Sequence, residues 1–376
     1  HPDGHYCLAS VKGVRQFAHA FPNVSVIISQ DHKAKIGLVI PAVGRTFCTL
    51  QSVSEPVQLP DHDFACRNSQ KLIPSVYLMI KPNEENDDLR TGQVAIFVRP
   101  QWSIGTSSIT HAEDLISLVS DNQYSEALKI NNEIKPIWVL LVDGGPDENP
   151  RHFKNIESYC KLFKKFDLDY LTVRTHAPGQ SKYNPVERSM ATLLGKLAGI
   201  VLPIDHFGKH LDSQSNVNDT NLATQNFNYA GTMLCDIWRR DPIFGKHDDI
   251  SVPWNWIEKH CNLCQYSLDV KRSSEVTEFL RLSNGFFPPV NRAKDGHYIN
   301  PVHLFQYSEQ FKVPNYDKHC PSISQTAYSR LCCSVCHKYF PTLAYITKHK
   351  REMHPSARGR PKKSQPKNSE SVVEAV

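Results

Sequence analysis

The stretch that decides the fold reads KPIWVLLVD and covers residues 135–143. Its uninterrupted apolar run predicts a strand that is buried on both faces, at the centre of a sheet. The run ends on Asp143, and the two glycines behind it, Gly144 and Gly145, allow the backbone to turn sharply. The sequence therefore predicts a carboxylate at the carboxyl end of a central strand.

Shorter β-branched and helical patterns flank this central strand. Strands are expected over 24–29, 35–41, 93–100 and 170–176, with the first two forming a hairpin. Helices are expected over 111–120 and 149–166, where apolar residues recur at helical spacing, and again around Glu187. Segment 46–92, rich in proline and polar residues, is expected to be an insertion between the second and third strands. The resulting order, β-β-β-α-β-α-β-α, predicts an α/β protein whose mixed sheet, flanked by helices, matches the RNase H-like fold.

Three acids occupy comparable places along this pattern. Asp31 ends the run VSVIISQD, Asp143 ends the central strand, and Glu187 opens the helical stretch NPVERSMATLLGKLAGI. Carboxylates from separate elements are what two-metal phosphoryl transfer requires, with the ions roughly 3.5–4 Å apart. Each acid alone is more ordinary as a turn or cap residue, and Asp147 and Glu148 then serve as N-terminal acids of the following helix. Their joint placement favours a metal site.

Three segments carry a family resemblance: SQDHKAKIGLVIPAVGRTF, LVDGGPDENPRH and APGQSKYNPVERSMA. They resemble the catalytic core of DDE-type transposases and integrases of eukaryotic mobile elements, over about residues 20–205. The resemblance implies an RNase H-like core over 1–208 and DNA strand cleavage and transfer with Mg²⁺ or Mn²⁺ held by Asp31, Asp143 and Glu187. The chain departs from the family in the long spacing before Glu187 and in His32, where close relatives carry an acid. Two alternatives stay open, a catalytically inactive transposon-derived DNA-binding scaffold and a structure-selective nuclease of the same fold.

The C-terminal part carries the ligand spacing of a two-Cys, two-His zinc finger. Cys333 and Cys336 are followed by His349 and His354, and Phe340 and Ile346 stand where such a finger places its small core. We expect a Zn²⁺-binding finger over 326–356, with Cys332 as an alternative ligand one residue earlier. The helix positions that would face bases are poor base readers, so non-specific phosphate contact is expected; they are Pro341, Ala344 and Thr347.

A basic tail follows the finger over 357–376. Arg358-Gly359-Arg360-Pro361, continued by Lys362 and Lys363, resembles an AT-hook, whose arginines enter a narrow A/T minor groove. The whole chain has a net charge of +5, and residues 348–367 alone carry +7. The rest of the chain is therefore slightly acidic, at about −2. The tail therefore predicts double-stranded DNA as partner and the nucleus as location, with a solvated charge run as the alternative.

The remaining predictions concern the cellular compartment, the accessory region and a second cysteine pair. The 11 cysteines, the lack of a leader and the lack of an apolar run near 18 residues predict reduced thiols and no membrane span. The chain begins with His1, so we expect a piece of a longer protein, and homo-oligomerisation stays open. An irregular, mostly helical accessory region is expected over 209–325. Within this region, a second zinc site could be formed by Cys261 and Cys264 with His319 and Cys320. The favoured interpretation is that Cys261 and Cys264 are ordinary buried thiols.

Overall fold

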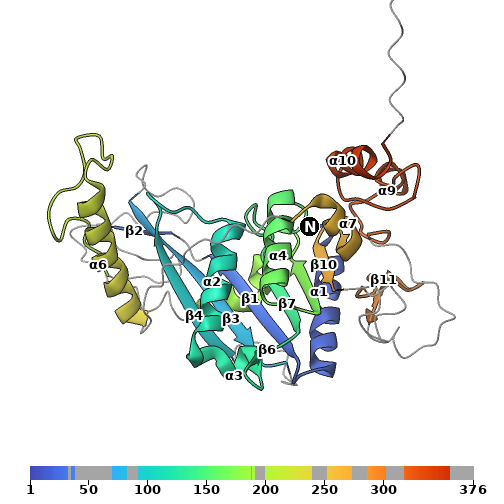
Figure 1. Cartoon of the computed structure of the whole chain (residues 1–376), viewed down its shortest axis with the longest axis horizontal. Coiled ribbons are helices and arrows are strands. Elements are labelled where there is room, and N and C mark those ends of the chain that lie inside the picture. The colour runs from blue at the N-terminus through green and yellow to red at the C-terminus, as the bar shows by residue number, and fades with distance from the viewer. Residues whose placement is uncertain are drawn as a thin grey trace, which may run out of the picture.

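The computed structural model describes residues 1–32, 35–38, 70–82, 92–187, 189–190, 200–238, 252–272, 286–301 and 317–355. A mixed sheet lies at the centre of the molecule, with helices on its faces (Figure 1). The expected α/β class is confirmed.

The sheet is built around two long parallel pairings. β7 (Ile137–Val142) lies between β1 (Ser25–His32) and β8 (Tyr170–Thr175), and is parallel to both. On the other side of β1, β3 (Lys71–Ile80) and β4 (Gly92–Pro100) follow as antiparallel neighbours. The resulting order β4-β3-β1-β7-β8 is that of an RNase H-like sheet.

The sheet differs from the expected one at both edges. β3 lies inside segment 46–92, which we expected to be an insertion, and it forms the antiparallel partner of β1. The predicted hairpin between residues 24–29 and 35–41 is wrong, because β2 (Ile36–Gly37) pairs with β3 and not with β1. At the far edge β10 (Ser267–Lys271) pairs with β8, and β9 (Cys261–Leu263) pairs with β10, so part of the expected accessory region extends the main sheet.

Alternating side chains of β7 divide the core into two layers. Trp138, Leu140 and Val142 enter the layer beneath α2 (Ser108–Ser120) and α4 (Phe153–Lys165). Ile137, Val139 and Leu141 enter the opposite layer, which is covered by α1 (Gly4–Ala20) and α6 (Thr220–Trp238). A central strand with apolar residues on both faces needs helices on both sides, which Figure 1 shows.

Helix α1 was not expected from the sequence, and its first turn is tied to distant segments. Asp3 is fully buried and accepts hydrogen bonds from the Tyr266 hydroxyl at 2.6 Å and the Ser322 backbone N–H at 2.7 Å. The Tyr6 hydroxyl donates to Asp317 Oδ1 at 3.0 Å. Residues 1–20 therefore complete a polar junction with residues beyond 260.

Shorter elements connect and cap these layers. They are η1 (Asn122–Tyr124), α3 (Ser125–Leu128), β5 (Lys129–Ile130), β6 (Glu133–Ile134), η2 (Ser181–Tyr183), α7 (Trp254–His260), β11 (Asn291–Arg292), β12 (Tyr298–Ile299), α9 (Gln325–Arg330) and α10 (Leu343–Met353). Helices α9 and α10 lie beside α7 at one end of the molecule (Figure 1). No helix within the described residues is long and apolar enough to span a membrane.

Candidate metal centre

Asp31 and Asp143 lie at the same edge of the sheet. β1 and β7 run parallel with Ser29 opposite Leu141, so the residues that follow on each strand reach the carboxyl edge together. Asp31 is the penultimate residue of β1, and Asp143 directly follows β7. The prediction that these acids end adjacent strands is confirmed.

The two glycines after Asp143 shape the turn that presents it. Gly144 has a φ of +95°, and a Cβ there would lie 2.3 Å from Thr175 Oγ1, so a side chain is excluded both by strain and by space. The backbone N–H of Gly145 donates to Asp143 Oδ1 at 2.7 Å, which fixes the carboxylate. Gly144 is therefore required by geometry as well as by turn preference.

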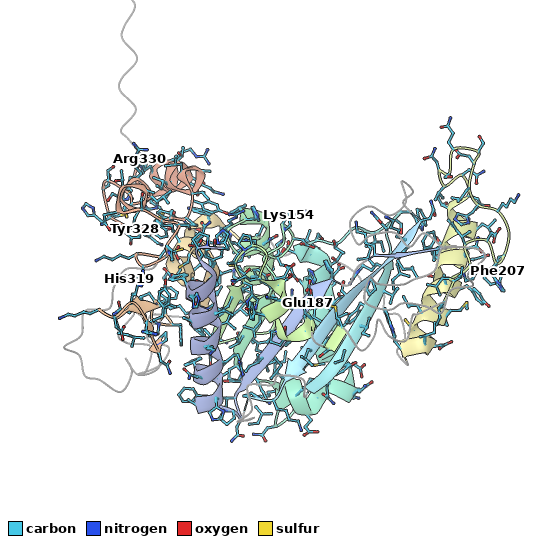
Figure 2. All side chains as sticks on the ribbon, turned by 180° about the vertical axis from the view of Figure 1, so that it is seen from behind. Lys154, Glu187, Phe207, His319, Tyr328 and Arg330 are labelled. Atoms are coloured by element: carbon cyan, nitrogen blue, oxygen red, sulfur yellow. The ribbon has the colours of Figure 1, made fainter. Side chains whose placement is uncertain are left out.

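Glu187 is positioned by a clamp between its own turn and β1. Asn184 Nδ2 donates to the Gln30 carbonyl at 3.0 Å, and Asn184 Oδ1 accepts from the Ser29 hydroxyl at 2.5 Å. Ser29 Oγ also accepts from the Val186 backbone N–H at 3.0 Å. Residues 185–187 are helical, and Figure 2 labels Glu187 near the middle of the molecule, beside the central sheet. The clamp thus holds the first turn of this helix against the end of β1.

Asp31 lies beside the two other predicted acids. Burial is the largest cause that raises the pKa of Asp31, and the charge of Asp143, a hydrogen bond with Glu187 and the charge of Glu187 add to it, for a value of about 9. The group of acids whose ligand atoms lie within 4.8 Å of one another consists of Asp31, Asp143 and Glu148, and Glu187 is not among them. The backbone N–H of His32, which donates to Asp31 Oδ1 at 2.6 Å, opposes the shift. Burial and the neighbouring acids thus both disfavour the charged form of Asp31.

A fourth acid, Glu148, belongs to the same site. Its carboxylate lies with those of Asp31 and Asp143 in one group whose ligand atoms are all within 4.8 Å of one another. Glu148 is 2% exposed and accepts from Gln30 Nε2 at 2.9 Å. Burial, followed by the charges of Asp143 and Asp31, raises the pKa of Glu148 well above its ordinary value. Its sequence interpretation as a helix N-terminal acid is wrong, because α4 begins only at Phe153.

His176 is a further neighbour of the acids that the sequence gave no reason to select. It follows β8 directly, is 2% exposed, and neither ring nitrogen has a hydrogen-bond partner among the residues that the structure describes. Burial lowers the pKa of His176 to about 4, although the charge of Asp143 opposes this. A neutral imidazole with a free N–H therefore lies beside the acid cluster.

The four predicted finger ligands also converge. Cys333, Cys336, His349 and His354 place their ligand atoms within 4.8 Å of one another, with Cys336 Sγ 3.2 Å from His349 Nε2. His354 Nε2 is buried without a hydrogen-bond partner. Partial burial raises the pKa of Cys333, but hydrogen bonds from the backbone of Cys336 and Val335 outweigh it and lower the value to about 7. Two thiols and two imidazoles in this arrangement fit a tetrahedral Zn²⁺.

The finger is docked on the core by the helix face that carries its ligands. His349 Nδ1 donates to both carboxylate oxygens of Glu258, at 2.8 and 2.9 Å, so its Nε2 is the nitrogen with the free lone pair. Glu258 belongs to α7, and its backbone carbonyl accepts from Lys338 Nζ at 2.6 Å. A carboxylate behind a ligating histidine orients the ring and raises its basicity. Sequence reasoning missed Glu258, since nothing in its own surroundings along the chain marks it.

A second set of contacts joins the finger helix to the loop behind Asp143. The Tyr345 hydroxyl donates to the Arg151 carbonyl at 2.7 Å, and the Tyr345 ring stacks on Trp254 with centroids 5.5 Å apart. Lys348 Nζ lies 4.0 Å from the ring centre of Phe153, the first residue of α4. Phe340 and Ile346, the expected finger core, are buried in the same cluster as β7 and α4. Of the expected base-facing positions, Ala344 and Thr347 are exposed and Pro341 is buried.

The remaining predicted residues lie outside these two centres. Cys261 Sγ is 3.4 Å from Cys160 Sγ, and burial raises the pKa of both Cys261 and Cys264 well above the ordinary value. Neither cysteine joins a metal-ligand group among the residues that the structure describes. The tail residues Arg358, Arg360, Lys362 and Lys363 lie outside the described part of the chain.

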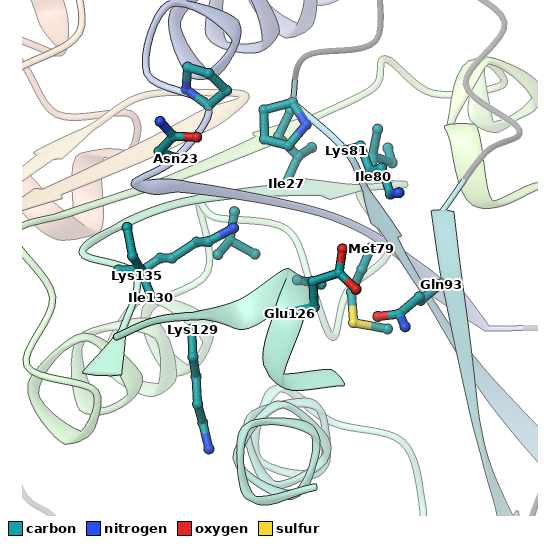
Figure 3. Close-up of a pocket in the computed structure, with 14 residues that line it drawn as sticks. Asn23, Ile27, Met79, Ile80, Lys81, Gln93, Glu126, Lys129, Ile130 and Lys135 are labelled. Atoms are coloured by element: carbon teal, nitrogen blue, oxygen red, sulfur yellow. The ribbon is translucent and has the colours of Figure 1, made fainter. Parts of the chain in front are cut away.

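A cavity of about 450 Å³ lies at the other end of the central strands, near the start of β1 (Figure 3). Its lining includes Ile27 near the start of β1, Ile80 at the end of β3, and Lys135. The acids follow the other ends of β1 and β7, so this cavity is separate from the acid cluster.

Comparisons with known proteins give similarities in structure only. No family model and no curated protein sequence matches the chain. The catalytic domain of the Mos1 mariner transposase aligns over 61% of this chain and 86% of its own, with 14% identity and a TM-score of 0.27. The Mos1 strand transfer complex aligns over 64% of this chain and 60% of its own, with 12% identity and a TM-score of 0.29. The RNase H-like order of the sheet follows from its own strand pairing.

Proposed function

We propose that this chain is a metal-dependent enzyme that cleaves and transfers DNA strands, in the manner of DDE-type transposases. The observation that supports the proposal is a cluster of acids from separate elements: Asp31, Asp143 and Glu148 place their ligand atoms within 4.8 Å of one another, and Glu187 is hydrogen-bonded to Asp31. Carboxylate oxygens are the donors that Mg²⁺ and Mn²⁺ prefer, and burial together with the neighbouring acids disfavours the charged form of Asp31.

The residues of the site have separate tasks in this reaction. Mg²⁺ or Mn²⁺ bound by Asp31, Asp143 and Glu187 supplies charge stabilisation for the attacking and leaving oxygens of the phosphodiester. The turn at Gly144 and Gly145 keeps Asp143 in place, and the Asn184 clamp keeps Glu187 against β1. His176, neutral at physiological pH, has an N–H available for a phosphate oxygen.

The C-terminal modules are assigned to structure and DNA contact. Zn²⁺ held by Cys333, Cys336, His349 and His354 stabilises the finger, and the docked helix face leaves only its outer face for phosphate contact. The tail from Arg358 to Lys363 supplies salt-dependent duplex affinity and a nuclear import signal. Homo-oligomerisation is compatible with this function and is measured directly by sedimentation of the full chain.

The deciding experiment follows two products separately. The full chain is incubated with a labelled duplex and Mg²⁺ or Mn²⁺, and nicked DNA is resolved from DNA in which strands have been joined. Joined product that disappears in Asp143→Asn supports strand transfer, and the matched control is Asp236→Asn, an exposed acid on α6. Nicking without joining identifies the chain as a nuclease. If no metal-dependent product forms on any duplex, the proposed enzymatic activity is contradicted. The catalytically inactive DNA-binding scaffold is then the better interpretation.

A further inference from the structure

A second group of ligand atoms lies on the α2 side of the acid cluster. It consists of His32 at the end of β1, His111 on α2, and Asp147 in the loop after β7, with all ligand atoms within 4.8 Å of one another. His32 Nε2 lies 2.8 Å from Asp147 Oδ2 and 3.0 Å from His111 Nε2. His111 Nε2 also lies 3.2 Å from Glu148 Oε1. Two imidazole nitrogens and two carboxylates therefore face one another.

The tautomer of His111 is fixed by the residues behind it. The Tyr77 hydroxyl donates to Asp114 Oδ2 at 2.6 Å, so the Tyr77 oxygen must accept from His111 Nδ1–H, also at 2.6 Å. Asp114 is held in turn by an ion pair with Arg99. The hydrogen of neutral His111 is thus on Nδ1, and the lone pair of Nε2 points toward His32 and Glu148. Such a hydrogen-bonded ring is how proteins orient a metal-ligating histidine.

The facing atoms are close enough to share one ion. His32 Nε2 lies between Asp147 Oδ2 and His111 Nε2, at 2.8 and 3.0 Å. Glu148 faces the same His111 nitrogen at 3.2 Å. One ion at roughly 2.0–2.2 Å from each ligand atom satisfies ligand atoms that are about 3 Å apart.

We propose that His32, His111 and Asp147 bind a divalent transition-metal ion of the zinc type, with Glu148 as a neighbouring carboxylate shared with the acid cluster. Imidazole ligands favour such ions over Mg²⁺, which prefers all-oxygen sites. The ion joins α2 to the end of β1 and to the loop that carries Asp143. This binding does not require the chain to cleave DNA.

Cobalt titration of the full chain tests the proposal. One equivalent of Zn²⁺ first fills the finger, excess Mg²⁺ occupies the acid cluster, and Co²⁺ is then added while its visible spectrum is recorded. Zn²⁺ outcompetes Co²⁺ for one and the same site, so the finger keeps its zinc. We expect one equivalent of bound Co²⁺ without a thiolate charge-transfer band, because the site contains no cysteine.

Matched variants decide where the cobalt binds. His32→Asn and His111→Asn should weaken Co²⁺ binding by about 100-fold or more, since losing even an outer-shell partner costs about 10–100-fold. His297→Asn, an exposed histidine, and Asp143→Asn should both retain it. If the variant of buried His111 fails to fold, His32→Asn and Asp147→Asn decide, because these two side chains are 19% and 22% exposed. Absence of the cobalt equivalent in the wild type, or its retention in the ligand variants, overturns the proposal.

Discussion

Asp31 illustrates how much of the site is determined by the electrostatic surroundings of one side chain. The carboxyl group is buried beside Asp143 and Glu187, so its charged form is disfavoured unless a cation is bound. Its protonation state therefore reports on metal occupancy, which gives the acid cluster a signature that can be measured without any DNA substrate.

Stability of the Mg²⁺-free protein should fall as the pH rises. The pKa of Asp31 is about 9 in the folded state, against about 3.9 in an unfolded chain. The folded state holds this proton more tightly, so its stabilising contribution is complete below pH ~4 and is lost on the way to pH ~9. We expect Asp31→Asn to flatten the decline in melting temperature between pH 6 and 8.5.

Added Mg²⁺ provides the complementary test of the same residue. The ion displaces the proton, so its stabilising effect should grow with pH in the wild type and be lost in Asp31→Asn. Asp236→Asn, an exposed acid on α6, is the control and should leave both pH profiles unchanged. Equal pH slopes in all three proteins would show that Asp31 is not protonated in the folded state.

Asn184 should be needed for the position of Glu187. Asn184→Ala removes the bonds to Ser29 and to the Gln30 carbonyl and leaves buried groups without partners, at about 1–3 kcal/mol each. We expect a lower melting temperature together with weaker Mn²⁺ binding, measured by the paramagnetic signal of free Mn²⁺. Asn218→Ala, at an exposed position, should change neither. Unchanged Mn²⁺ affinity in folded Asn184→Ala would mean that Glu187 does not depend on the clamp.

Among the elements, predictability followed the strength of the local pattern. β7 was predictable because a strand buried on both faces is apolar throughout. β3 was missed because Pro74 interrupts its apolar run and the residues before it are polar, whereas its position depends on pairing with β1 and β4. α1 was missed although Cys7, Val11, Val14 and Ala18 recur at helical spacing, because Gly4 and Gly13 within it are poor helix formers.

The same distinction applies to the candidate sites. Asp31, Asp143 and the finger cysteines could be predicted from the sequence, because their neighbours along the chain indicate the end of a strand or the spacing of zinc ligands. Glu148 and Glu258 were not, since each gains its role from partners contributed by other elements. Glu148 depends on Gln30 and His111, and Glu258 on His349.

Helix α7 should contribute to zinc affinity through Glu258. Glu258→Gln keeps the size of the side chain but weakens the acceptor for His349 Nδ1–H, so Zn²⁺ affinity should fall by about 10–100-fold. Competition of the full chain with a chromophoric chelator measures this. Glu352→Gln, an exposed position on α10, is the matched control and should bind as the wild type does. Equal affinity in both variants would show that α7 does not support the zinc ligand.

At the scale of the whole molecule, the tail should provide A/T-preferring, salt-sensitive DNA affinity. Replacing Arg358 and Arg360 with Ala should weaken duplex binding and reduce the salt slope by about two, one for each lost phosphate contact. Fluorescence anisotropy across a salt series measures both quantities, on A/T-rich and G/C-rich duplexes. A variant whose affinity and slope match the wild type would identify the run as a solvated or import sequence.

The polar junction at Asp3 and Tyr6 has a consequence for how the chain is made. The Tyr6 hydroxyl reaches Asp317 across 311 positions, and buried Asp3 has no bond to Ser322 until that segment is present. At a synthesis rate of about 5–20 residues per second, Asp3 and Tyr6 wait roughly 15 to 60 s for these partners. The apolar face of α1 packs on β1, β7 and β8, which end by Thr175, so in this interval it is the Asp3 carboxylate and the Tyr6 hydroxyl that lack their bonds. Slower synthesis, or a break in the chain before residue 317, should therefore lower the yield of folded protein even with every metal ligand intact.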